Sequence, residues 1–166
     1  MRILGIDPGT ISLGYGVVDE EREMQMVACG VLVCSPRTPM EKRLCSLYER
    51  LVKVIGEHGP DEVAIEDPFV GHNAKSAFAV GRAQAIAILA AANQGLPIYY
   101  YSPAQVKRQV TNYGQSDKQQ VQEMVKLQLK LPYLPQPSDA ADALAVAICH
   151  IQQSHLDHWL AGRVSK

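Results

Sequence analysis

The sequence has few of the features that are typical of extracellular, zinc-binding or membrane-embedded proteins. Its four cysteines show no CxxC pair or other zinc spacing, which favours buried thiols in a reducing compartment. No apolar run approaches the ~20 residues of a membrane span. The short apolar stretch at the N-terminus is interrupted by Asp7, so it lacks the layout of a secretory signal. We therefore expect a cytoplasmic protein with no membrane partner.

The chain also lacks a strong overall charge, since its formal net charge is −1. The distribution is uneven: residues 1–71 hold 7 Lys and Arg against 12 Asp and Glu, whereas residues 72–130 hold 7 against 2. Such an asymmetry is a hint of an anionic partner. Basic residues on solvated helix faces would give the same pattern, so charge alone does not decide.

At 166 residues the chain is long enough for one domain with a substantial core. Short apolar runs predict five strands, over residues 2–7, 12–19, 24–34, 61–66 and 96–102. Apolar spacing and alanine-rich composition predict five helices, over residues 40–58, about 74–93, 103–110, 116–130 and from 138 onward. Gly59 and Pro60 are expected to end the first helix, and Ser116 to cap the fourth. We place a single domain over residues 1–154 and a polar C-terminal tail over residues 155–166.

The order of these elements predicts an α/β fold. Strands one, four and five are separated by helices, which favours parallel pairing, whereas strands two and three form an antiparallel hairpin at one edge. The expected architecture is a mixed five-stranded sheet flanked by helices.

Four carboxylates stand at positions where this fold can bring them together. Asp7 and Glu66 directly follow apolar runs that are typical of buried parallel strands, and ligands bind outside the carboxyl ends of such strands. Asp139 and Asp142 are three residues apart in the last helix, so they share one face, and no Lys or Arg lies between Pro135 and His150 to pair with them.

Converging carboxylates repel one another and need a cation. Mg²⁺ prefers oxygen ligands, and paired metals stabilise both the attacking and the leaving oxygen in phosphoryl transfer. Taken singly, each acid has an ordinary explanation, because strand ends favour turn residues and the helix dipole favours Asp139. Asp142 is harder to explain, since it lies one turn further into an apolar helix.

Four segments resemble, in order and spacing, blocks of the RuvC-type Holliday junction resolvases. They are GIDPGTISLGYGVV (5–18), VAIEDPFVGHNAKSA (63–77), PAQVKRQVT (103–111) and LPQPSDAADALAVAICH (134–150). The resemblance implies a ribonuclease H-like fold and a homodimeric endonuclease that nicks two strands of like polarity in a four-way DNA junction, in DNA recombination and repair. It also implies one or two Mg²⁺ per active site, with Mn²⁺ as a substitute, and a branch-migration motor as partner.

The resemblance assigns roles to individual residues. The four acidic metal ligands and catalytic residues of the family fall on Asp7, Glu66, Asp139 and Asp142. With metal-activated water, the products are expected to carry a 5′-phosphate and a 3′-hydroxyl.

Three further positions of the family concern DNA. Its loop aromatic matches Phe69, which is expected to stack on a junction base, although a core anchor for the loop is the alternative. Its two basic positions match Lys107 and Lys118, which are expected to contact phosphates.

The sequence departs from the family pattern in two motifs. Gln84 stands where a basic residue is usual, and Arg82 and Lys75 are expected to compensate as DNA contacts. Asn112 replaces the first glycine of a Gly-x-Gly loop, and the sequence pI of about 6.5 is low for this family. Weaker or more salt-sensitive DNA binding is one consequence to test.

Three other functions are compatible with parts of the sequence. A YqgF-type ribonuclease H-like nuclease acting on RNA also begins with an Asp-x-Gly-Thr strand, but its other blocks are missing here. The actin/sugar-kinase group shares that motif, yet needs two such subdomains, for which 166 residues are too few. A non-catalytic junction-binding protein would gain nothing from four acids.

Overall fold

The computed structural model describes residues 1–67 and 74–164, with the side chains of residues 74–75 and 162–164 outside that description. None of the helices in this part of the chain is long and apolar enough to cross a membrane.

The five strands form one mixed sheet in the order β3-β2-β1-β4-β5. Their bounds are β1 Arg2–Asp7, β2 Ser12–Glu20, β3 Met24–Val33, β4 Glu62–Glu66 and β5 Ile98–Tyr101. β1 pairs with β4, and β4 with β5, in parallel, whereas β1–β2 and β2–β3 are antiparallel. The predicted sheet is therefore confirmed.

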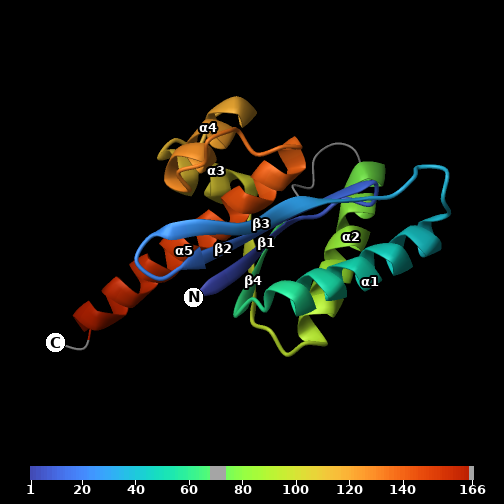
Figure 1. Cartoon of the computed structure of the whole chain (residues 1–166), viewed down its shortest axis with the longest axis horizontal. Coiled ribbons are helices and arrows are strands. Elements are labelled where there is room, and N and C mark those ends of the chain that lie inside the picture. Colours follow the sequence, from blue (N-terminus) through green and yellow to red (C-terminus); the bar gives the residue numbers. More distant parts are fainter. Residues whose placement is uncertain (68–73, 165–166) are drawn as a thin grey trace.

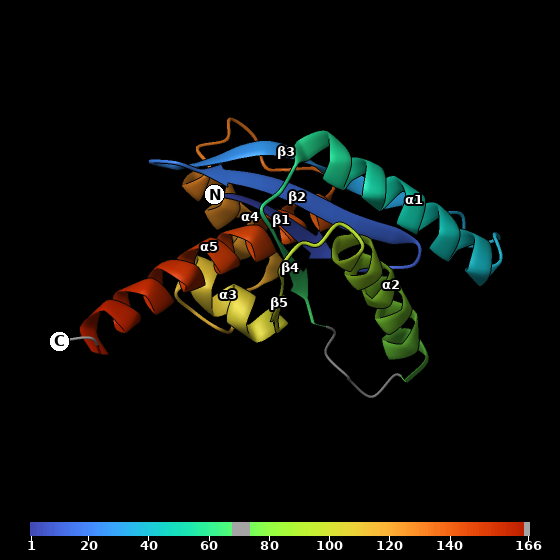
Figure 2. The ribbon, with the colours of Figure 1, turned by 90° about the horizontal axis from the view of Figure 1, so that it is seen from below.

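Helices cover both faces of this sheet, five of them within the described residues (Figures 1 and 2). They are α1 Met40–His58, α2 Ala74–Ala92, α3 Pro103–Thr111, α4 Lys118–Gln128 and α5 Ser138–Val164. Helices α1 and α2 share one apolar core with Leu4, Ile6 and Val17. Helices α3, α4 and α5 share the other core with Ile3 and Val18, as the alternation of strand side chains requires.

The ends of the helices follow local chemistry, with one correction to the sequence prediction. Gly59 ends α1 in the left-handed region at φ 53°, as expected. Helix α4 is capped by Asp117, whose side chain accepts from the N–H of Gln120, and not by Ser116. The Ser116 side chain is buried and bonds Thr111 and Tyr113 instead, so it is not free to cap the helix.

Helix α5 lies directly on the sheet because small residues line the contact. A Cβ added at Gly5 would lie 2.1 Å from the carbonyl oxygen of Ala143, and one at Gly14 would lie 2.0 Å from that of Asp139. Any larger residue at either position would push the helix away. The first turn of α5 is thereby held against β2 and the neighbouring end of β1.

The last turns of α5 project beyond the sheet (Figures 1 and 2). The helix continues without a break through residues 155–164, where Leu156 and Leu160 are exposed and His155 contacts Glu20 at 3.0 Å. The domain boundary after residue 154 stays a prediction.

Candidate active site

Two carboxylates lie at the shared edge where β1 and β4 end. The strands are parallel, with Ile6 opposite Ile65, so Asp7 and Glu66 follow as neighbours on the face that α5 covers. The side chains of Asp7 and Glu66 are joined by a hydrogen bond. Carboxyl groups share a hydrogen bond when one of them keeps its proton, which indicates an excess of negative charge.

The first turns of α5 bring two more carboxylates to the same place. Oxygen atoms of Asp7, Asp139 and Asp142 all lie within 4.8 Å of one another. Glu66 joins this group through its hydrogen bond to Asp7. The structure therefore brings together the four acids that the sequence predicts, two from the sheet and two from the helix; we call them the acid cluster.

Burial and mutual repulsion perturb the acid cluster strongly. Burial, followed by the charges of Glu66, Asp142 and Asp139, raises the pKa of Asp7 to about 8. Burial also raises the pKa of Asp142 and, together with the charge of Asp142, that of Glu66. Asp7 therefore holds its proton well above the pH range that is ordinary for an aspartate, and together with its neighbours it forms a site suited to a cation, whose charge would replace that proton.

Lys118 lies inside this site, closer to the acids than its predicted role as a phosphate contact requires. Its Nζ is 2.6 Å from Asp142 Oδ2 and 3.9 Å from Asp139 Oδ1. Partial burial acts to lower the pKa of Lys118, but the hydrogen bond to Asp142 and the surrounding charges outweigh it, and the pKa is raised. Lys118 therefore supplies positive charge to the acid cluster.

A small hollow of about 180 Å³ opens beside the acids. Glu66, Asp142, Lys107 and Lys118 line it, together with apolar residues of α3, α4 and α5. The positive charges of Lys107 and Lys118 act to lower the pKa values of Glu66 and Asp142. Both predicted basic positions thus share one hollow with the carboxylates.

Two further side chains hold the surroundings of the acid cluster: Ser12, which no sequence pattern points to, and Gln84, which the sequence marks only as a departure from the family pattern. The Ser12 hydroxyl donates to Asp139 Oδ2 at 2.6 Å. The Gln84 amide, on α2, donates to Asp67 Oδ1 at 2.8 Å and ties this helix to the residue after Glu66. Neither contact has a local sequence signal, because a serine after a turn and a glutamine on a helix are ordinary surface residues.

The remaining predicted DNA contacts are not part of the acid cluster as described. Arg82 is exposed on α2 and, in the described part of the chain, no hydrogen bond or ion pair joins it to the acids. Phe69 lies outside the described residues, as does the side chain of Lys75. Their assignment to DNA stays a prediction.

The structure gives His150 partners that lie outside the acid cluster. Its buried ring contacts the Tyr101 hydroxyl at 2.7 Å and a Glu62 carboxylate oxygen at 2.6 Å. Glu62 begins β4, whereas Glu66 ends it. His150 thus belongs to a buried polar network at the opposite end of the strand.

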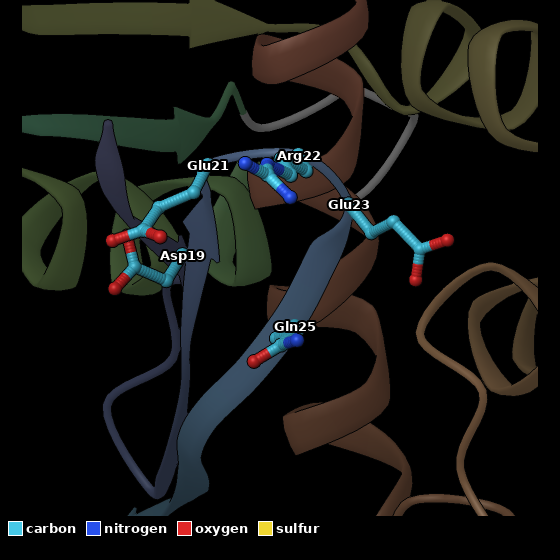
Figure 3. A pocket seen from close by; sticks show the side chains of 5 residues that line it. All are labelled: Asp19, Glu21, Arg22, Glu23 and Gln25. Carbon is cyan, nitrogen blue, oxygen red and sulfur yellow. The ribbon is translucent and has the colours of Figure 1, made fainter.

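A wider hollow of about 480 Å³ lies at the turn between β2 and β3 (Figure 3). Its five lining side chains spread around the turn and do not converge on one point (Figure 3). The most constrained of them, Asp19, already pairs with Arg2 at 2.8 Å. This hollow therefore lacks the convergent groups of an active site.

The chemistry of the acid cluster fits a hard divalent cation. All of its donors are carboxylate oxygens, the ligands that Mg²⁺ and Mn²⁺ prefer, and the described residues add no His or Cys to the cluster. The raised pKa values indicate charge that a cation would neutralise.

The fold and the acid cluster together define a nuclease of the ribonuclease H-like class. The structure superposes on Thermus thermophilus RuvC with a TM-score of 0.88, at 34% identity, over 95% of this chain and 97% of that one. It is equally similar to T. thermophilus RuvC in complex with a Holliday junction substrate, with a TM-score of 0.90 at 34% identity over 95% and 96%.

Sequence comparison defines the family. The model of crossover junction endodeoxyribonuclease RuvC matches residues 3–150. A crossover junction endodeoxyribonuclease RuvC of Dehalococcoides mccartyi is 53% identical over 92% of both chains, and one of Roseiflexus is 47% identical over 90% of this chain and 89% of its own. The chain belongs to the RuvC family.

Proposed function

We propose that the protein resolves four-way DNA junctions by paired nicks in strands of like polarity, using a divalent cation held by the acid cluster. The observation that carries the proposal is the convergence of Asp7, Asp139 and Asp142 within 4.8 Å, with Glu66 bonded to Asp7, in a chain of the RuvC family. The family match favours this function over the YqgF-type alternative on RNA.

Asp7, Glu66, Asp139 and Asp142 are the proposed cation ligands. We propose Mg²⁺ as the physiological ion, with Mn²⁺ as a substitute, because both accept hard oxygen ligands. When bound, the ion supplies activation of a water and stabilisation of the 3′-oxygen leaving group, so we expect 5′-phosphate and 3′-hydroxyl ends.

The chain's own residues prepare the site for this reaction. Because its pKa is raised, Asp7 keeps a proton, and it must release that proton before its carboxylate can hold a cation. Lys118, which pairs with Asp142, then becomes available to a DNA phosphate at the mouth of the same hollow. Lys107 lines that hollow too and would hold a second phosphate oxygen; such contacts position DNA without reading its sequence.

Further DNA contacts are proposed from the family resemblance. Phe69, which follows Glu66 by three residues, would stack on an unpaired base, a contact that tolerates any base because each has an aromatic face. Lys75 and Arg82 would add phosphate contacts from α2. The T. thermophilus relative solved in complex with a Holliday junction substrate supports junction DNA as the partner.

Paired nicks support a homodimer as the active form. The described part of each chain carries one acid cluster, so two nicks in one junction need two chains or two successive events. Helix α2 exposes Phe78 and Leu89, apolar side chains suited to an interface. A branch-migration motor as a further partner follows from the family resemblance, and we propose a cytoplasmic location from the sequence composition.

The test is cleavage of matched substrates. We expect a synthetic four-way junction to be nicked with Mg²⁺ and left intact with a chelator, while a linear duplex and an RNA–DNA hybrid of the same sequence stay intact. Preferred cleavage of the hybrid would replace the proposal with an RNA-directed nuclease. Tight junction binding without cleavage under any divalent cation would leave only a junction-binding protein.

A further inference from the structure

One hydrogen bond joins the acid cluster to the β1–β2 turn. The hydroxyl of Ser12, the first residue of β2, donates to Asp139 Oδ2 at 2.6 Å across 127 positions of sequence. Bonds from a hydroxyl to an ionised carboxylate are short and stronger than those between neutral groups. Ser12 thus engages one particular oxygen of one particular acid.

The backbone that leads into Ser12 is fixed by two contacts. Arg43, on α1, reaches the carbonyl and hydroxyl oxygens of the buried Thr10 at 3.5 and 3.4 Å. The N–H of Cys34 donates to the Ile11 carbonyl at 2.7 Å. Both contacts hold residues immediately before Ser12, so the hydroxyl starts from a defined position.

The backbone of Asp139 is fixed relative to the same strand. Gly14, two residues after Ser12 and on the same face of β2, packs so closely that an added Cβ would lie 2.0 Å from the Asp139 carbonyl oxygen. Neither end of the Ser12–Asp139 bond can therefore move far without the other. The backbone at each end of this hydrogen bond is therefore held nearly fixed.

The second oxygen of Asp139 faces the positive charge in the site. Asp139 Oδ1 lies 3.9 Å from Lys118 Nζ and accepts a longer hydrogen bond, 3.3 Å, from Ser138. Lys118 Nζ also touches Asp142, so it marks where a cation meets both acids. Ser12 occupies Oδ2, and Oδ1 is turned toward the Lys118 ammonium group.

We infer that Ser12 is a positioning residue that fixes the orientation of Asp139 for cation binding. The inference rests on the proposed function, because it takes Asp139 as a ligand. Partners that orient metal ligands commonly contribute about 10–100-fold to metal affinity or activity. Mg²⁺ demands near-octahedral geometry, whereas Ca²⁺ accepts irregular sites, so an oriented carboxylate matters more for Mg²⁺.

The test compares Ser12→Ala with Ser12→Thr, which keeps the hydroxyl, by calorimetric titration of the full chain with Mg²⁺ and separately with Ca²⁺. We expect Ser12→Ala to weaken Mg²⁺ binding about 10-fold and Ca²⁺ binding clearly less, and Ser12→Thr to restore much of the loss. Ser154→Ala removes a hydroxyl bonded within α5, to the Ile151 carbonyl, and is the matched control that should change neither affinity.

Two results would overturn the inference. Unchanged Mg²⁺ affinity in Ser12→Ala would show that Asp139 needs no orientation, and equal losses for Mg²⁺ and Ca²⁺ would show a general structural effect. The proposed function fails separately, when the wild-type chain shows no Mg²⁺ binding that depends on Asp7. Thermal melts of each variant without metal establish that the compared proteins are folded.

Discussion

Replacing Asp7 with asparagine is expected to stabilise the cation-free protein while removing its response to Mg²⁺. Asparagine has nearly the shape of a protonated aspartate but carries no titratable charge. In the native chain the pKa of Asp7 is about 8, against an ordinary value of 3.8, because the carboxyl is buried beside other acids. The unfolded chain therefore releases this proton at a much lower pH than the folded chain does.

The sign of the effect follows from this difference. Below about pH 4 both states hold the proton, and the contribution of Asp7 to stability is fully present; it is lost progressively as the pH rises toward about 8. A pH near 7 lies roughly three units above the pKa of Asp7 in the unfolded chain. Keeping the proton on Asp7 in the folded chain therefore costs at most about 4 kcal/mol of stability, at 1.36 kcal/mol per unit. The other acids share part of the repulsion. We therefore expect Asp7→Asn to raise the free energy of unfolding by about 2–4 kcal/mol near pH 7, and by less at about pH 5.

Urea unfolding followed by far-UV circular dichroism, in chelator, measures this difference at several pH values. Fluorescence is a poorer reporter, since the single tryptophan, Trp159, lies in the projecting end of α5. Addition of Mg²⁺ at 100 times Kd should stabilise the wild type by about 2.7 kcal/mol and the variant little, so the difference in stability between them should fall by about that amount. An Asp7→Asn protein that is no more stable than the wild type near pH 8, with the same pH dependence, would refute the electrostatic reasoning.

Two further predictions concern the basic hollow and the buried network of α5. Lys107→Ala and Lys118→Ala should each weaken junction binding and reduce the slope of log affinity against log salt by about one, and an unchanged slope would show that these lysines do not contact DNA phosphates. His150→Leu should lower the free energy of unfolding by about 2–4 kcal/mol, because the Glu62 carboxylate and the Tyr101 hydroxyl lose their partner, while cleavage by the folded fraction is retained. A loss of stability below about 0.5 kcal/mol would show that water replaces the ring at both atoms.

The sequence predicts the sheet and the acid cluster because both depend on strong local patterns. Parallel order follows from helices between strands, and Asp7 and Glu66 are adjacent because both end parallel strands. The position of Asp142 on a buried helix was informative for a similar reason, since a charge in an apolar segment needs a partner.

Other features depend on tertiary contacts that no local pattern encodes. Ser116 and Asp117 both carry a suitable oxygen for capping, and the choice depends on the hydrogen bonds that bury Ser116. Lys118 lies 24 residues before Asp142, and only the packing of α4 on α5 brings its amine to the carboxylate. The Ser12–Asp139 bond spans the chain and could not be predicted from sequence spacing.

Cleavage of a synthetic four-way junction by the wild type and by Asp7→Asn tests the central claim most directly, with binding measured in parallel. We predict that the wild type, with Mg²⁺, makes symmetric nicks with 5′-phosphate ends, and that the variant binds the junction but does not cut it. Nicking by Asp7→Asn at the wild-type rate would contradict the assignment of the acid cluster as the catalytic centre.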